Sequence, residues 1–364
     1  MNKTLITGNE ACGEGAIQAD CRFYAGYPIT PQNELTAYMS KRMDEENGVF
    51  IQAESEIAAI NMVFGASGAG ARAMTTSSSP GISLKQEGIS YLAGCQLPAV
   101  IVNVMRGGPG LGNIAPSQAD YFQATKGGGH GDYNMVVLAP ASVQEMFDFT
   151  YEAFDIADKY SNPVMILSDG MIGQMMEPAV IVRERRTKDD GRGTKAWVLD
   201  GCKGRKKRVI RSLFLAEGVL EDWNKELQKK FDKMRKNEVR FEKYRAENAE
   251  IIIVAYGTSA RIARASVDEL RKNNKAVGLF RPISLWPYPY DALKKLDTGK
   301  TKFLVVEMSA GQMVEDVRLA IEDKKRIYFH GRMGGGVPEE ADIVKLVKKI
   351  LKDKKSKTKN QKHI

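Results

Sequence analysis

The chain has 364 residues, 43% of them hydrophobic and 27% charged, which allows two α/β domains with separate cores. No apolar run is long enough to span a bilayer, and the N-terminus lacks the apolar segment of a secretion signal, so we expect a cytoplasmic enzyme that does not contact a membrane. The formal net charge of +9 invites a nucleic-acid-binding interpretation, and the location of the excess charge has to decide it.

The first candidate site residue is Thr30. A helix is expected over 9–20 and a short strand over 21–26, and the sequence YPITP at 27–31 then ends that strand in a rigid turn. A hydroxyl between two prolines at the carboxyl end of a strand lies where open α/β sheets bind ligands. The same hydroxyl is equally suited to capping the next helix, which begins near Glu34.

Two carboxylates, Glu54 and Glu56, stand where the extended run 49–51 gives way to a helical pattern. An acid fixed at such a junction can hold a proton against a bound heterocycle. The alternative is that both are helix N-terminal acids favoured by the helix dipole. The two side chains would share a face in a strand but not in a helix, so the direction of Glu54 stays open, and the dipole role is preferred for it.

A cation follows the apolar run 97–104, which has the pattern of a buried parallel strand. Arg106 and the glycine-rich stretch 107–112 predict an anion held beside exposed backbone amides. The stretch 113–132 is predicted to be a long binding loop, and His130 within it a surface residue.

The remaining strands and helices alternate, which predicts a doubly wound parallel sheet in a first domain that spans residues 1–182. A charged linker follows at 183–249, with residues 220–246 read as one charged bridging helix. A second α/β domain spans 250–352, and a basic tail occupies 353–364.

Much of the excess positive charge lies in 203–211 and in the tail, without interleaved aromatic residues. Such runs are usually solvated loops. We therefore expect no nucleic-acid partner, while a nucleic-acid-binding α/β protein that uses these segments stays a competing hypothesis.

The cysteines are predicted to be buried, reduced thiols. They are scattered, and no pair has the spacing of a zinc or iron–sulfur motif, so we expect no metal ligated by this chain alone. The four are Cys12, Cys21, Cys95 and Cys202.

These motifs together carry a family resemblance. They are YPITP at 27–31, QAESEIAAI at 52–60, RGGPGLGN at 106–113, HGD at 130–132, LAPASVQE at 138–145 and FRPISLWPYP at 280–289. In this order they resemble the alpha subunit of the 2-oxoacid:ferredoxin oxidoreductases. The resemblance implies two doubly wound parallel-sheet domains: a pyrimidine-binding domain for thiamine diphosphate and a domain of transketolase C-terminal type.

The resemblance also implies partners. Thiamine diphosphate would be shared with a beta subunit that carries the diphosphate-binding domain, while Mg²⁺ and [4Fe–4S] clusters would lie on partner subunits. Small ferredoxin-like subunits would pass electrons to ferredoxin, CoA would be the acyl acceptor, and the assembly would be a dimer of hetero-oligomers. The GDG signature of the diphosphate half is missing from this sequence, so the chain alone should be inactive.

The site residues are carried over position by position. Glu56 matches the catalytic and cofactor-binding glutamate that contacts the pyrimidine N1′, and Thr30 and Arg106 match positions that bind the substrate carboxylate. Intact Thr30, Glu56 and Arg106 speak against a non-catalytic scaffold with a degenerate pocket.

The loop after Arg106 resembles that of chains assigned to branched-chain 2-oxoacids such as 3-methyl-2-oxobutanoate, which implies oxidative decarboxylation to an acyl-CoA. No Lys or Arg occurs in 107–125 to hold a second carboxylate, which fits an apolar substrate, while Lys126 keeps 2-oxoglutarate or another 2-oxoacid as the alternative.

Overall fold

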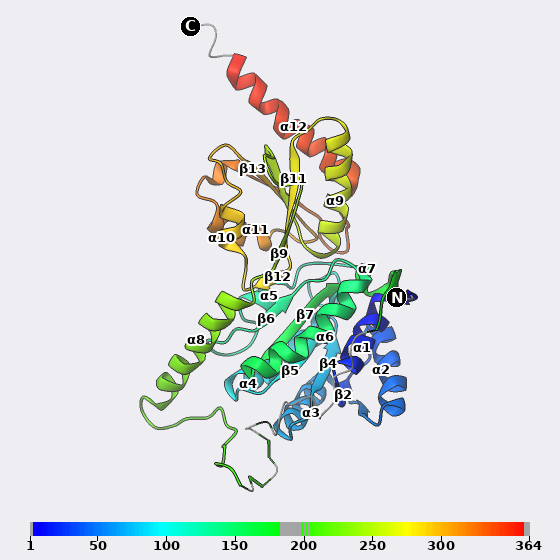
Figure 1. Cartoon of the computed structure of the whole chain (residues 1–364), viewed down its shortest axis with the longest axis vertical. Coiled ribbons are helices and arrows are strands. Elements are labelled where there is room, and N and C mark those ends of the chain that lie inside the picture. Colours follow the sequence, from blue (N-terminus) through cyan, green and yellow to red (C-terminus); the bar gives the residue numbers. More distant parts are fainter. Residues whose placement is uncertain (1–2, 183–194, 196–197, 200, 203, 360–364) are drawn as a thin grey trace.

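The computed structural model describes residues 3–182, 195, 198–199, 201–202 and 204–359, with the backbone alone for 353–359. The described chain forms two stacked α/β parts, with the N-terminal part below and the C-terminal part above in Figure 1. The long helix α8 (Val219–Asn237) runs along one flank of the lower part.

The lower part is built on a seven-stranded sheet in the order β12-β6-β7-β5-β4-β2-β3, and the strands are parallel except for the edge strand β12. The near-continuous apolar runs of the central strands explain their burial on both faces. In chain order the strands are β2 (Phe23–Gly26), β3 (Val49–Gln52), β4 (Ala73–Ser77), β5 (Ala99–Met105), β6 (Val136–Leu138), β7 (Pro163–Asp169) and β12 (Ser284–Trp286).

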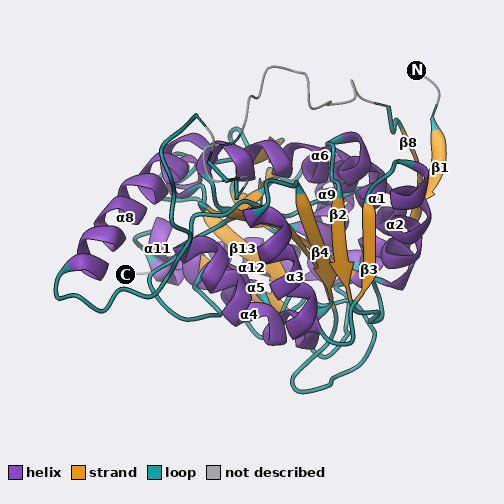
Figure 2. Ribbon diagram, turned by 90° about the horizontal axis from the view of Figure 1, so that it is seen from below, coloured by secondary structure: helices purple, strands orange, loops and turns teal. Residues whose placement is uncertain are grey.

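Helices cover both faces of this sheet, as Figure 2 shows. On one face lie α1 (Gly8–Gln18), α2 (Asn33–Glu45) and α6 (Val143–Tyr160); on the other lie α3 (Glu56–Gly68) and α4 (Ser79–Gly94). The short helices α5 (Tyr121–Thr125) and α7 (Gly170–Gln174) follow β5 and β7, and β1 (Thr4–Thr7) pairs antiparallel with β8 (Met176–Ala179). This arrangement confirms the doubly wound prediction.

The upper part has a five-stranded sheet in the order β14-β13-β10-β11-β9, parallel except for β9. Its strands are β9 (Phe241–Tyr244), β10 (Ile251–Val254), β11 (Val277–Pro282), β13 (Lys302–Glu307) and β14 (Ile327–Gly331). Its helices are α9 (Gly257–Lys272), α10 (Tyr290–Lys294), α11 (Met313–Ala320) and α12 (Glu340–Lys359), together with a 3₁₀ turn at Lys324–Arg326.

One predicted helix was wrong. The stretch 220–246 is not a single helix, because α8 ends at Asn237 and residues 241–244 form β9, which pairs antiparallel with β11. The charged residues of β9 obscure the alternation of apolar and polar side chains that is typical of a strand. Phe241 stacks on Phe280 at 5.6 Å between ring centroids, whereas the next residue, Glu242, pairs with Arg264. Tertiary pairing of this edge strand overrides the helical appearance of a charged sequence.

Three smaller expectations also needed correction. The loop predicted over 113–132 contains the short helix α5. Cys202 is half-buried, whereas the other three cysteines are buried as predicted. Of the tail, residues up to Lys359 continue α12, and 360–364 lie outside the described residues, as does the start of the predicted linker at 183–194.

Polar contacts join the two parts. Gln118 donates from Nε2 to the carbonyl oxygen of Tyr256 at 2.8 Å, and its Oε1 accepts from Ser259 Oγ at 2.8 Å and from the Met308 amide at 2.9 Å. At the end of β7, Asp169 accepts from Thr258 Oγ1 at 2.8 Å. The carboxyl ends of the lower parallel strands therefore lie against the upper part.

Candidate active site

Glu56 opens helix α3, directly after Ser55, whose Oγ accepts the amide of Ala58 at 3.1 Å and caps the helix. The residue is only 7% exposed, whereas Glu54 two positions earlier is exposed. The open question about direction is thus resolved: Glu56 points inward and Glu54 points to solvent. A carboxylate in the first turn also interacts favourably with the helix dipole.

The first turn of α4 lies directly against this carboxyl group. A β-carbon built at Gly81 would come within 2.6 Å of Oε1 of Glu56 and 2.1 Å of Oγ of Ser77, so no larger residue fits there without movement. Among the described residues, the buried hydroxyls of Ser77 and Ser78 have no hydrogen-bond partner. Buried polar groups are normally hydrogen-bonded, and the unpartnered hydroxyl of Ser77 adjoins Glu56 at Gly81.

The structure brings Thr30 and Arg106 into direct contact. Arg106 follows β5, is 7% exposed, and donates from Nη1 to the carbonyl oxygen of Thr30 at 3.0 Å and from Nη2 to that of Leu111 at 2.9 Å. In the described part of the chain it pairs with no carboxylate, and its buried Nε is unpartnered. Oγ1 of Thr30 accepts from Asn33 Nδ2 at 3.2 Å. The guanidinium keeps an uncompensated charge, which suits an anionic ligand.

Ser79 links the two regions. Oγ of Ser79 accepts the amide of Arg106 at 3.0 Å, and the amide of Ser79 donates to Oδ1 of Asn103 at 3.0 Å. Asn103 donates in turn to Asp120 at 2.9 Å, and burial raises the pKa of that carboxyl above its ordinary value. The N-terminus of α4 therefore touches the surroundings of Glu56 through Gly81 and those of Arg106 through Ser79.

Sequence reasoning missed Lys85, which is completely buried on α4 and donates from Nζ to Thr75 Oγ1 at 2.9 Å. Burial lowers the pKa of its ammonium to about 8, and the charge of Glu56 acts in the opposite direction. One signal could have identified it: Gly81, Lys85 and Gly88 fall on one helical face, and a lysine on an otherwise small, buried face is rare.

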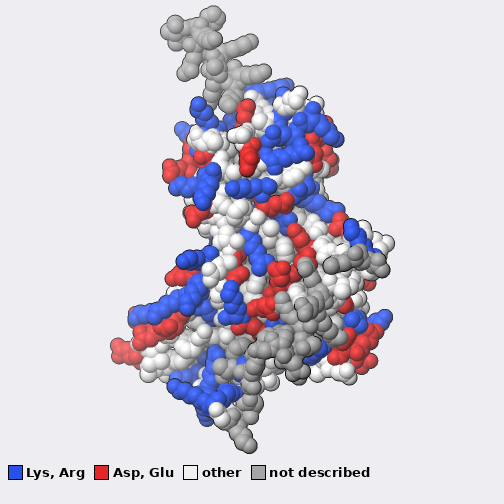
Figure 3. Space-filling model, viewed as in Figure 1, with Lys and Arg blue, Asp and Glu red and all other residues white. Residues whose placement is uncertain are grey.

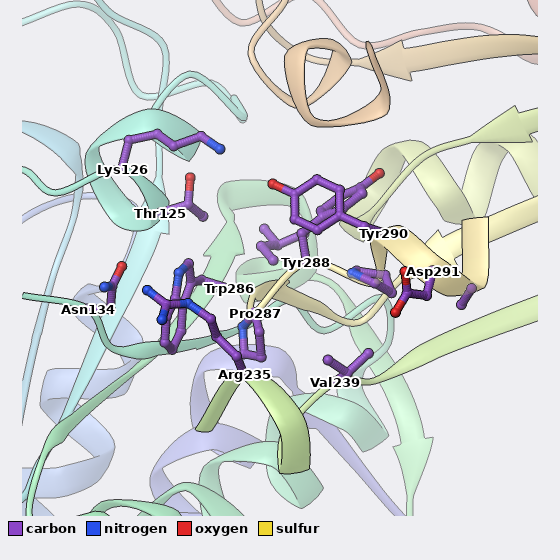
Figure 4. A pocket seen from close by; sticks show the side chains of 13 residues that line it. Thr125, Lys126, Asn134, Arg235, Val239, Trp286, Pro287, Tyr288, Tyr290 and Asp291 are labelled. Atoms are coloured by element: carbon purple, nitrogen blue, oxygen red, sulfur yellow. The ribbon is translucent and has the colours of Figure 1, made fainter. Parts of the chain in front are cut away.

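A separate cavity of about 550 Å³ lies between the two parts of the chain (Figure 4). It is lined by Lys126, Arg235, Trp286 and Tyr290 among others, and by none of Thr30, Glu56 and Arg106. Lys126 Nζ donates to the buried carboxylate of Asp316 at 2.6 Å, and this ion pair occupies its charge. The cation that the sequence left open for a second substrate carboxylate is therefore paired with a carboxylate of this chain.

Three further findings concern the described residues as a whole. His130 is exposed, as expected. Within the described ranges, no three His, Cys, Asp or Glu side chains gather as a metal site would require, and no helix is both long and apolar enough to cross a membrane. On the face shown in Figure 3, basic and acidic side chains are interspersed over both parts, and Lys and Arg gather below α8.

The fold and the site together define an α/β enzyme chain that presents a buried acid and an unpaired guanidinium at the carboxyl edge of a parallel sheet. The comparisons make this class specific. A family described as "Pyruvate flavodoxin/ferredoxin oxidoreductase, thiamine diP-bdg" matches residues 14–244, and "Pyruvate:ferredoxin oxidoreductase core domain II" matches residues 249–343. The chain belongs to this oxidoreductase family.

Individual relatives agree. The chain is 49% identical to ketoisovalerate oxidoreductase subunit VorB of Methanothermobacter thermautotrophicus over 97% of its own length and 99% of that protein. It is 43% identical to 2-oxoglutarate synthase subunit KorA of Archaeoglobus fulgidus, over 87% of this chain and 91% of that one. The solved 2-oxoglutarate:ferredoxin oxidoreductase of Magnetococcus marinus superposes with a TM-score of 0.85 at 27% identity, over 96% of this chain and 65% of that one.

Gly81→Ala tests the close approach of α4 to Glu56. The added methyl group has to displace Glu56 or Ser77, so we expect the free energy of unfolding of the full-length chain to fall by about 1–3 kcal/mol in denaturant titrations. Gly65→Ala is the matched control, because Gly65 is an exposed residue inside α3 with open space around it. There alanine should raise stability by about 0.5–1 kcal/mol. Equal effects of the two substitutions would contradict the packing described.

Proposed function

We propose that this chain is the pyrimidine-binding subunit of a thiamine-diphosphate enzyme that oxidatively decarboxylates a branched-chain 2-oxoacid, 3-methyl-2-oxobutanoate, with CoA and ferredoxin. The observation that carries the proposal is the buried carboxyl group of Glu56 in close contact with Gly81 in the first turn of α4, with the unpaired Arg106 joined to the same helix end. The VorB relatives, whose name states ketoisovalerate as their substrate, support this choice of 2-oxoacid.

The residues present fit the cofactor. Gly81 places no side chain against Glu56, and the unpartnered buried hydroxyl of Ser77 adjoins the same point and is available to a polar atom of the pyrimidine ring. When bound, thiamine diphosphate supplies the carbon nucleophile that adds to the 2-oxo carbon and stabilises the charge left after loss of CO₂. The part of Glu56 is to share one proton with the pyrimidine nitrogen N1′, held in a site from which water is largely excluded.

Arg106 and Thr30 would hold the carboxylate of the 2-oxoacid. Backbone carbonyl groups hold two nitrogens of the Arg106 guanidinium, so its charge is in position before the substrate binds. One of these carbonyl groups belongs to Thr30, whose hydroxyl therefore lies in the same turn. Since 107–125 holds no Lys or Arg and Lys126 is engaged by Asp316, these residues offer no cation for a second carboxylate. This favours the branched-chain acid over 2-oxoglutarate, the substrate that the KorA relatives' name implies.

A partner subunit would complete the site. The segments that carry the site residues also expose large apolar side chains, namely Tyr27 at 39%, Ile57 at 50% and Leu111 at 80% exposure. Apolar groups gathered around a site are typical of a surface that another chain covers. We assign the diphosphate and Mg²⁺ half to a beta subunit and the [4Fe–4S] clusters to partner chains, in a cytoplasmic dimer of hetero-oligomers, with this chain divided at 182 and 250 as the sequence predicts.

Substrate choice is tested on the complex co-expressed and purified with its partner chains without oxygen. We expect kcat/KM for 3-methyl-2-oxobutanoate to exceed that for 2-oxoglutarate by about a hundredfold or more, because a buried second carboxylate without a partner costs several kcal/mol. CoA-dependent reduction of ferredoxin measures both. A preference for 2-oxoglutarate would refute the branched-chain assignment and leave the family membership intact.

Glu56→Gln should leave the fold of the complex unchanged and lower kcat by a factor of about 10² to 10⁴, because the amide cannot exchange the proton that the pyrimidine nitrogen requires. Glu54→Gln is the matched control, since that side chain is exposed two residues earlier, and its turnover should stay within twofold of wild type. Near-normal turnover by Glu56→Gln would show that this carboxyl has no role in the reaction.

Arg106→Ala should raise KM for the 2-oxoacid by a factor of about 10 to 100, the loss expected when a charge-assisted pair with a carboxylate is removed. Because both 2-oxoacids carry the carboxylate that Arg106 binds, KM should rise for 3-methyl-2-oxobutanoate and 2-oxoglutarate alike. Steady-state kinetics at saturating CoA measure this. An unchanged KM would assign Arg106 to holding the 107–112 loop in place.

A further inference from the structure

Lys85 is a buried charge that neither the motifs nor the proposed roles explain. Its side chain is completely inaccessible, and its described contact is the hydrogen bond to Thr75 Oγ1 on β4. Lysine is almost never fully buried without a paired charge, since removing an ammonium group from water costs several kcal/mol. No carboxylate of the described residues forms a direct ion pair with its Nζ.

The packing of α4 on α3 places Lys85 next to Glu56. Gly81, Lys85 and Gly88 lie at positions i, i+4 and i+7, which share one face of a helix. The first of these glycines adjoins the carboxyl group of Glu56, and the second packs on Ile60 so tightly that a β-carbon there would lie 2.6 Å from Ile60 side-chain atoms. Lys85 therefore stands between two points at which α4 touches α3, on the side that faces Glu56.

Thr75 fixes the direction of the side chain. Thr75 and Ser77 alternate with Thr76 along β4, and Thr76 donates to Gln32 on the opposite face of the sheet. The hydrogen bond to Thr75 thus holds Nζ of Lys85 on the face that carries Ser77 and Glu56. Burial lowers the pKa of the Lys85 ammonium, and the charge of Glu56 acts in the opposite direction, as expected for two neighbouring groups of opposite sign.

We propose that Lys85 is a positioning residue whose buried ammonium group supplies the counter-charge that holds the carboxyl group of Glu56 in place until the pyrimidine nitrogen of the cofactor binds. This inference rests on the proposed function, because it gives Lys85 a task in the site where Glu56 meets the cofactor. Through-space attraction in a water-poor interior is strong without direct contact. A purely structural lysine would fill the same space with no dependence on Glu56.

A double-mutant cycle on the full-length chain, without cofactor, separates these roles. Methionine has the length of lysine without its charge, so Lys85→Met leaves the Glu56 carboxyl group without its counter-charge, and its effect on the folding equilibrium constant at pH 7 should be at least tenfold less favourable in the wild-type chain than where Glu56 is replaced by glutamine. In the Glu56→Gln background the same substitution should be neutral or stabilising. Lys41→Met on the exposed side of α2 is the control and should change little in either background.

The stability difference between wild type and Lys85→Met depends on pH with a defined sign. The pKa of Lys85 is about 8 in the folded chain, below the ordinary 10.5 of the unfolded chain. Between these values the unfolded chain binds more protons at this residue, so the contribution of Lys85 to stability rises with pH from about 8 to about 10.5 and is constant below about 8. The stability of wild type relative to Lys85→Met should follow that rise.

In the assembled complex, Lys85→Met should raise the thiamine diphosphate concentration needed for half-saturation about tenfold and leave KM for the 2-oxoacid unchanged. Additive stability effects of the two substitutions, in a complex that Glu56→Gln still inactivates, would overturn the role of Lys85 alone. A complex that tolerates Glu56→Gln would overturn the proposed function, and with it the positioning role of Lys85, whatever the stability cycle shows.

Discussion

The site depends on how closely two helices on one face of the first sheet approach each other. Helix α4 passes Glu56 and Ile60 at positions 81 and 88, both glycines, and at each of them a β-carbon would lie within 2.6 Å of atoms of α3. Close packing of this kind removes water from the carboxyl group while the free start of α3 still stabilises its charge. A carboxyl held in this manner can exchange a proton with a bound ring and yet stay ordered without one.

The second half of the chain fixes the other half of the site. The stretch between β5 and β6 carries Arg106 and would be long and unsupported by itself, but Gln118 joins it to Tyr256 and Met308, which follow β10 and β13. Asp316 of the upper part also accepts hydrogen bonds from Tyr121 and Lys126 of this stretch. Asn113 donates to the carbonyl oxygen of Gly334 at 2.8 Å. These contacts with the upper part hold the loop in place, and they thereby fix the direction of the Arg106 guanidinium.

Much of this arrangement was accessible from the sequence. The apolar runs of β5 and β7 and the alternation of strands and helices identify the parallel sheet, and the motifs around Glu56, Thr30 and Arg106 predict the candidate site. What the sequence concealed depends on contacts between distant segments. β9 and β12 are short edge strands whose pairing with β11 and β6 is set by the packing of the two parts, and residues 241–244 carry charges that imitate a helix. Lys85 was missed because a lysine in a helix is usually exposed, and its place on one helical face with Gly81 and Gly88 was the one sign in the sequence that this one is buried.

The balance of buried charge connects the roles of Glu56, Lys85 and Arg106. Glu56 contributes one negative charge, whereas Lys85 and Arg106 contribute two positive charges, and all three side chains are almost inaccessible to water. If Lys85 serves Glu56, then one positive charge is left over, and it is on Arg106, whose described partners are carbonyl oxygens alone. A buried excess charge is costly until a ligand of opposite sign arrives. A single carboxylate on an otherwise apolar molecule would neutralise it, whereas a dicarboxylate would leave a new negative charge without a partner, so the residues proposed to bind the 2-oxoacid would also discriminate against a second acidic group.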